Sequence, residues 1–107
     1  MSEGRPPRIR LGKADLGEGE LRGYEAGPAL FVLVCRLEGR CRAIDDWCGH
    51  SGCLLSGGRR EGRAVICPCH EIRFDLENGQ NLTDPALCGD QRRFTVEEEG
   101  GSLFLVL

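Results

Sequence analysis

The sequence predicts a mostly β, antiparallel fold of about ten short strands. Its 107 residues include 16 glycines, which are typical of tight turns between short strands. Helical periodicity is scarce, and short apolar or alternating runs are bounded by Gly, Pro and Asn. This length suits one domain. We therefore expect residues 1–107 to form a single domain, with residues 1–7 as a flexible N-terminal extension.

The expected strands can be placed in order along the chain. Residues 31–35 form a continuous apolar run between turn residues, which is typical of a buried strand. Residues 40–44 alternate, with Cys41 and Ala43 on one face and Ile44 on the other, which predicts the next strand. Further elements are expected at 64–66, at 73–76 with an Asn78-Gly79 turn, and at 91–98 and 102–107, a hairpin joined by Gly100-Gly101. Residues 11–23 give no clear prediction.

Charge and hydropathy exclude several classes of function. The net charge is −3 at pH 7, and neither a basic stripe nor a polyacidic tail is present, so a nucleic-acid partner is not expected. No run approaches the roughly 18 apolar residues that cross a bilayer. The first ten residues carry charges and two prolines where a secretory signal has an apolar segment. We expect a cytoplasmic protein that does not bind membranes.

Two cysteine and histidine motifs carry the chemistry. Cys48-Gly49-His50 is followed, sixteen residues later, by Cys67-Pro68-Cys69-His70. Thiolate and imidazole are the ligands of iron–sulfur centres and of zinc. Each motif offers one of each kind, which matches a [2Fe–2S] centre with two Cys on one iron and two His on the other. A structural zinc site with the same four ligands is the alternative.

The chain resembles the Rieske-type iron–sulfur proteins through this pattern, C-x-H-x16-C-x-x-H. The resemblance spans about residues 8 to 107 and includes the framing segments 43–46, 55–58 and 73–75. It implies a single Rieske domain with one [2Fe–2S] cluster held between two loops at one tip. Cys48 and Cys67 would hold the buried iron, and His50 and His70 the outer iron, facing solvent.

The same resemblance implies a second feature of the loops. High-potential Rieske proteins of quinol-oxidising complexes join the two loops by a disulfide, and Cys53 and Cys69 stand in the matching positions here. We expect a Cys53–Cys69 disulfide, with two buried free thiols as the alternative. Cys35, Cys41 and Cys88 are expected to be core or loop thiols, and Trp47 a packing lid.

The chain departs from the quinol-oxidising class at two positions. That class has a serine two residues and a tyrosine four residues after the second histidine, where their hydroxyls donate to cluster sulfur. Ile72 and Phe74 stand there in this chain, and neither can donate. Because hydrogen bonds to the sulfurs raise the reduction potential, we expect a potential below that class. In this respect the chain resembles the soluble ferredoxins of aromatic-ring dioxygenases.

These features predict a one-electron carrier between a reductase and a terminal oxygenase or similar oxidoreductase, with no small-molecule substrate of its own. The alternative is a small subunit fixed to a larger oxidoreductase, which a large apolar surface around His50, Leu54 and Leu55 would favour. An enzyme of the Rieske oxygenase type needs a mononuclear iron held by two His and one carboxylate. The chain has only two histidines, and both are assigned to the cluster.

Overall fold

The computed structural model describes residues 7–48, 52–84, 86 and 88–107. Within them the chain forms nine strands and one 3₁₀ turn, η1 (Leu55–Gly57), and no helix that could cross a membrane. The strands are β1 (Arg8–Lys13), β2 (Leu21–Gly27), β3 (Leu30–Leu37), β4 (Arg40–Asp45), β5 (Arg59–Glu61), β6 (Ala64–Ile66), β7 (Arg73–Asp75), β8 (Arg93–Glu99) and β9 (Ser102–Val106). All ladders between these strands are antiparallel, so the predicted fold class is confirmed.

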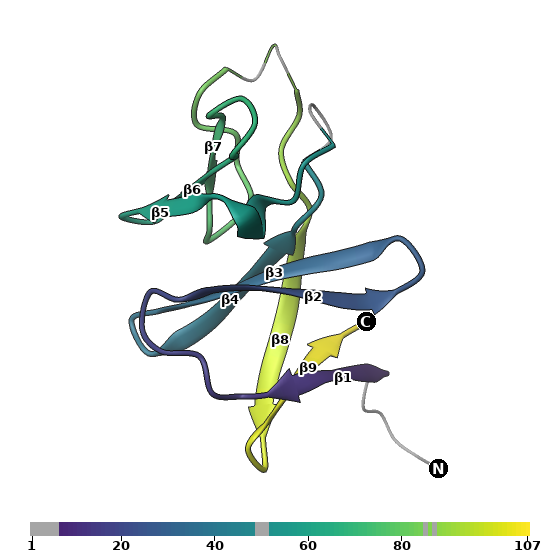
Figure 1. Ribbon diagram of the computed structural model, residues 1–107. Helices are drawn as coiled ribbons and strands as arrows, with labels where there is room; N and C mark the ends of the chain where they lie inside the picture. The colour runs from purple at the N-terminus through teal and green to yellow at the C-terminus, as the bar shows by residue number, and fades with distance from the viewer. Residues whose placement is uncertain (1–6, 49–51, 85, 87) are drawn as a thin grey trace.

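The strands form two sheets at different ends of the molecule. The larger sheet has the order β1-β9-β8-β4-β3-β2, and its edge strands β1 and β2 contact each other, so the sheet curls toward a barrel. The smaller sheet has the order β5-β6-β7. Figure 1 shows the smaller sheet beyond the end of β4, where the chain leaves the larger sheet. The loop after β4, the loop after β6 and the segment between β7 and β8 share this upper end.

Strand β3 lies at the centre of the hydrophobic core. Val32, Leu33, Val34 and Cys35 are all fully buried, as their continuous apolar run predicts. Successive side chains of a strand face opposite ways, so β3 serves two cores. Leu33 and Cys35 join the core that contains the predicted ligand cysteines, and Val32 and Val34 join the core beneath β8 and β9.

The predicted strands at 31–35, 40–44, 64–66 and 73–76 are confirmed as β3, β4, β6 and β7, and the C-terminal hairpin as β8 and β9. Glu38 and Gly39, with φ of 56° and 75°, connect β3 to β4. Gly100 and Gly101, with φ of 59° and 78°, connect β8 to β9. A two-residue hairpin turn with both residues left-handed matches the twist of its strands, so both hairpins close tightly.

Three strands were not predicted from the sequence. β1 and β2 border the segment that gave no clear pattern, and their side chains are only partly buried or exposed. All three residues of β5 are exposed, so no apolar periodicity marks it, and it exists by pairing with β6. Of the expected N-terminal extension, residues 1–6 lie outside the described residues, and the Pro7 carbonyl accepts a 2.9 Å hydrogen bond from Leu107.

Candidate metal centre

The first loop, residues 48–53, leaves the end of β4 with Cys48 at its base. The Cys48 N–H donates to the carbonyl of Cys53 at 2.9 Å, and the Gly52 N–H donates to the carbonyl of Cys48 at 2.8 Å. Gly52 has a φ of 73°, which suits glycine and reverses the chain. A bridge between Trp47 and Leu54 closes the loop below these bonds. Residues 49–51, and with them the predicted ligand His50, lie outside the described residues.

The second loop, residues 67–72, repeats this construction after β6. The Cys67 N–H donates to the carbonyl of Ile72 at 2.9 Å, and the Glu71 N–H donates to the carbonyl of Cys67 at 2.9 Å. Glu71 takes the left-handed position with a φ of 57°. Each predicted ligand cysteine therefore begins a loop closed by the same two backbone hydrogen bonds, to the fourth and fifth residues after it. We refer to the two as the paired loops.

A disulfide joins the paired loops. Cys53 and Cys69 are bonded, with their Cα atoms 6.4 Å apart, as the resemblance implied. The alternative of two buried free thiols is wrong on both counts, because the sulfurs are linked and Cys69 is exposed. The link therefore fixes the second loop to the first from its solvent side.

The predicted ligands Cys48, Cys67 and His70 differ in exposure. Cys48 and Cys67 are fully buried in one apolar group, beside Leu55 and Phe74. The His70 side chain lies on the exposed part of the second loop. Buried thiolates with outer imidazole are what a mixed cluster requires, because its all-thiolate iron must be shielded and its imidazole iron reaches solvent. The described residues fit that group.

The full ligand set is not assembled within the described residues. In the ranges 7–48, 52–84, 86 and 88–107, no three His, Cys, Asp or Glu side chains are grouped closely enough to hold a metal ion. The structure brings Cys48 and Cys67 into one core and ties their loops together. The four-residue set with His50 and His70 stays a prediction.

Ile72 and Phe74 face the buried side of the second loop. Both are almost completely buried in the same apolar group as Cys48 and Cys67. The two positions where the quinol-oxidising class carries hydroxyls therefore present only hydrocarbon to the core. Burial without a donor also keeps water away from the cysteines.

A buried carboxylate supports the base of the first loop. Asp46 accepts hydrogen bonds from the N–H and the hydroxyl of Ser56, both at 2.6 Å, and its backbone carbonyl accepts one from Leu55. Burial raises the pKa of Asp46, and the Ser56 bonds act against that rise. A Cβ on Gly23 would lie 2.6 Å from both Asp46 and Ser56, so glycine is required for this packing.

The segment between β7 and β8 contributes residues that sequence reasoning missed. Gln91 is buried, and its amide donates to the carbonyls of Asp45 and Trp47 at 2.8 and 2.7 Å, which holds the entry to the first loop. Asn81, also buried, donates to the carbonyl of Cys88 at 3.0 Å. No periodicity or motif marks these amides, because their partners are distant backbone carbonyls.

The remaining thiols behave largely as expected. Burial raises the pKa of Cys35 to about 11, so this core thiol stays protonated at neutral pH. Cys88 packs against the apolar group that contains the predicted ligands Cys48 and Cys67, and burial raises the pKa of its thiol. Trp47 stacks on Phe31 at 6.2 Å between ring centroids but remains 48% exposed, so it covers the loop only in part.

Comparison with known proteins agrees with this architecture. The family model for the Rieske [2Fe-2S] domain matches residues 9–95. The chain belongs to the Rieske [2Fe–2S] domain family. It is 34% identical over 92 residues to the ferredoxin component of an alkene monooxygenase system from Xanthobacter autotrophicus, covering 85% of this chain and 73% of that protein. It is 33% identical over 91 residues to the ferredoxin component of the naphthalene 1,2-dioxygenase/salicylate 5-hydroxylase systems from a Ralstonia species, covering 85% and 86%.

A solved structure shares the Rieske fold closely. A chain from the complex of reduced oxygenase and oxidized ferredoxin in carbazole 1,9a-dioxygenase superposes with a TM-score of 0.82 and 25% identity, covering 92% of both chains. Membership of the Rieske family implies a [2Fe–2S] cluster, which argues against the zinc alternative.

Proposed function

We propose that the chain is a one-electron carrier that holds one [2Fe–2S] cluster through Cys48, His50, Cys67 and His70. The observation that carries this proposal is the pair of matching loops, each with a buried cysteine at its base, cross-linked by a disulfide in a Rieske domain. When bound, the cluster supplies a one-electron redox couple. The chain contributes the site, its charge and its shielding from water.

The burial of each proposed ligand indicates which of the two irons it would hold. Cys48 and Cys67 would hold the inner iron within the apolar group, and His70, on the exposed part of its loop, would hold the outer iron with His50. Two thiolates and two neutral imidazoles cancel the charge of two ferric ions and two sulfides. An added electron therefore meets less Coulomb repulsion than in a four-cysteine site, and Rieske potentials run from about −150 to +300 mV against about −400 mV.

The partners are proposed from the relatives. The Xanthobacter and Ralstonia proteins are ferredoxin components of oxygenase systems, and the carbazole dioxygenase structure contains a ferredoxin with its oxygenase. We infer that this chain accepts electrons from a reductase and delivers them to a terminal oxygenase or similar oxidoreductase. It has no catalytic site of its own, since its only two histidines are allotted to the cluster. We also propose that the protein is cytoplasmic, which cell fractionation tests.

Iron and sulfide analysis combined with EPR of the dithionite-reduced protein tests the proposal. We expect two irons and two sulfides per chain. The reduced protein should give a rhombic signal whose average g lies below that of four-cysteine ferredoxins. Zinc in place of iron after anaerobic preparation, with no EPR signal, would overturn the electron-carrier function and leave a structural metal site.

A further inference from the structure

The predicted ligands are divided between the two sheets. The first loop, with Cys48 at its base, follows β4 of the larger sheet, and the second loop, with Cys67 at its base, connects β6 to β7 of the smaller sheet (Figure 1). A cluster held by both loops would therefore bridge the two sheets. Whether the ligands of the two loops meet depends on how the smaller sheet is placed against the larger one.

Apolar packing joins the two sheets but does not by itself fix their relative position. Leu33 and Ile44 of the larger sheet pack in one core with Val65 and Phe74 of the smaller sheet. Apolar attraction is non-directional, so it does not specify a single register between the sheets. The disulfide links the paired loops on their solvent side, and a second directional contact lies farther along β4.

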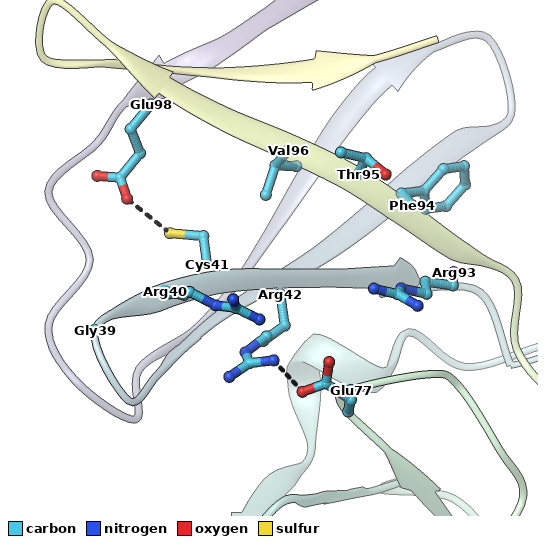
Figure 2. A pocket seen from close by; sticks show the side chains of 10 residues that line it. All are labelled: Gly39, Arg40, Cys41, Arg42, Glu77, Arg93, Phe94, Thr95, Val96 and Glu98. Atoms are coloured by element: carbon cyan, nitrogen blue, oxygen red, sulfur yellow. Dashed lines mark hydrogen bonds and ion pairs between the residues drawn. The ribbon is translucent and has the colours of Figure 1, made fainter.

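Arg42 and Glu77 make this second contact. Arg42 lies on β4, six residues before Cys48, and its side chain is only 8% exposed. Its guanidinium group donates to Glu77, which follows the end of β7 by two residues. Figure 2 shows the two side chains pointing toward each other, with this bond as a dashed line. The pair therefore joins the strand that leads into the first loop to the strand that leads out of the second.

The other ion pairs around Arg42 involve exposed side chains. Arg63, which is exposed, donates to Glu77 at 2.9 Å. Glu38 accepts from Arg42 at 3.3 Å and lies 3.8 Å from Arg63, but its side chain is 71% exposed. Exposed ion pairs contribute little because water and salt screen them. The partly buried pair of Arg42 and Glu77 is therefore the main polar connection at this position.

A buried ion pair is a costly way to stabilise a protein, because both charges leave water. Apolar side chains of similar volume often stabilise a protein as well or better. A charged hydrogen bond, in contrast, has a defined direction and length, so it favours one arrangement of the groups that carry it. The Arg42–Glu77 pair is thus suited to fixing the position of the smaller sheet.

We propose that Arg42 is a positioning residue for the metal centre. Through Glu77 it holds the smaller sheet, and with it the second loop, in the place where the ligands of the paired loops meet. This inference rests on the proposed cluster site. Its hydrogen-exchange test does not depend on which metal is bound, so a failure of the inference can be distinguished from a failure of the proposed function.

Three measurements on the full, cluster-loaded chain with Arg42→Met test the proposal. We expect iron to be released to a chelator roughly tenfold faster, the value of one charged hydrogen bond. Amide hydrogen exchange should become faster in β6 and β7 and stay native in β1, β8 and β9. The EPR signal of the reduced protein should broaden, because the paired loops then adopt a range of arrangements.

Arg36→Met is the matched control. Arg36 is also a largely buried arginine, 18% exposed, but its partners Leu16, Gly39 and Glu98 all lie outside the smaller sheet. Its replacement should lower the unfolding temperature and leave iron release and the EPR signal native. Equal changes of iron release and EPR signal in Arg36→Met and Arg42→Met would show that Arg42 contributes only general stability, and would overturn the proposal.

Glu77→Gln removes the same ion pair from its other side. It should release iron about as fast as Arg42→Met, and the double variant should release it no faster than either single variant, because all three lack the same contact. Native iron release together with native exchange in β6 and β7 of Glu77→Gln would also overturn the proposal.

Discussion

Ile72 and Phe74 are the residues that we expect to keep the reduction potential of this chain below that of the quinol-oxidising class. Both side chains lie in the buried group with Cys48 and Cys67, and neither has a hydroxyl. Ile72→Ser and Phe74→Tyr place donors where a cluster sulfur would accept them. Each hydrogen bond should raise the potential by roughly 40 mV, from about 1 kcal/mol per bond and 59 mV per tenfold change. A redox titration followed by visible circular dichroism measures this.

A packing control separates the hydroxyl from the loss of volume. Ile72→Val removes one methylene and adds no donor, so its potential should stay at the native value while its stability falls by about 1 kcal/mol. If Ile72→Ser and Ile72→Val have the same potential, a missing hydroxyl at position 72 does not lower the potential of this chain.

At the scale of elements, Gly79 holds the segment after β7 against the first loop. Its φ is 81°, and a Cβ there would overlap the backbone carbonyl of Gln91. Gly79→Ala should displace Gln91, whose amide bonds Asp45 and Trp47, and so loosen the entry to the first loop. We expect a lower unfolding temperature and faster release of iron on heating.

Gly62 provides the matched control. It has a φ of 60° in the turn between β5 and β6, and a Cβ there would meet nothing within 4 Å. Gly62→Ala should therefore cost only the strain of a left-handed alanine, about 1 kcal/mol, with native iron retention. Equal losses in the two variants would show that the contact with Gln91 is not what requires glycine at position 79.

The Cys53–Cys69 disulfide links two elements that are otherwise separate loops. The bridged residues are 16 positions apart, and a loop of this length predicts a loss of about 3 kcal/mol in unfolding free energy when the bond is removed. Because Cys69 is exposed, a mild reductant should reach the bond in the folded protein. Thermal unfolding of Cys53→Ser/Cys69→Ser, and of the native chain with reductant, should show the same decrease.

Cys41→Ser tests whether this decrease belongs to the disulfide. Cys41 is a half-buried thiol outside any disulfide, so its replacement should leave the effect of reductant intact. Reductant that leaves the unfolding temperature of the native chain unchanged would mean that the link contributes nothing to stability.

Glu18 connects the segment before β2 to the β3–β4 turn and makes it sensitive to acid. The N–H groups of Gly39 and Glu38 donate to its carboxylate and lower its pKa from the ordinary 4.5. Since the folded pKa is the lower one, the stabilisation is present above pH 4.5 and is lost as the pH falls through the folded pKa. Below that pH, the unfolding temperature of the native chain should fall more steeply than that of Glu18→Gln. If the unfolding temperatures of the native chain and of Glu18→Gln fall equally with pH, Glu18 does not have this role.

The sequence predicted some kinds of element and missed others. β3 was found because both its faces are buried, and the loop cysteines were found because their spacing is itself a signal. β5 was missed because its residues are exposed, and the roles of Asn81 and Gln91 because their partners are backbone carbonyls brought near only by folding. The predicted ligand His50 lies outside the described residues, so its assignment rests on the motif.

At the scale of the whole molecule, the exposed apolar surface distinguishes a carrier from a fixed subunit. The fixed-subunit alternative would be favoured by a large apolar surface around His50, Leu54 and Leu55. Of these, His50 lies outside the described residues, Leu55 is fully buried, and Leu54 is 38% exposed beside its bridge partner Trp47. Within the described residues, Trp47 and Leu54 form a patch of two side chains at the base of the first loop. This is small for a permanent interface, which normally buries a broad apolar area. It suits a transient partner, so gel filtration with the oxygenase should show two separate proteins.

The same patch should control the rate of electron delivery. Trp47→Ala and Leu54→Ala remove contact area at the base of the first loop without touching a predicted ligand. We expect stopped-flow reduction of the terminal oxygenase to slow several-fold in these variants, with an unchanged reduction potential. Leu107→Ala is the control, because Leu107 is 60% exposed at the chain end that Figure 1 places far from the paired loops. Equal slowing by Leu107→Ala would contradict the role of this patch in electron delivery. Co-elution of the native chain with the oxygenase at all dilutions would favour the fixed-subunit alternative.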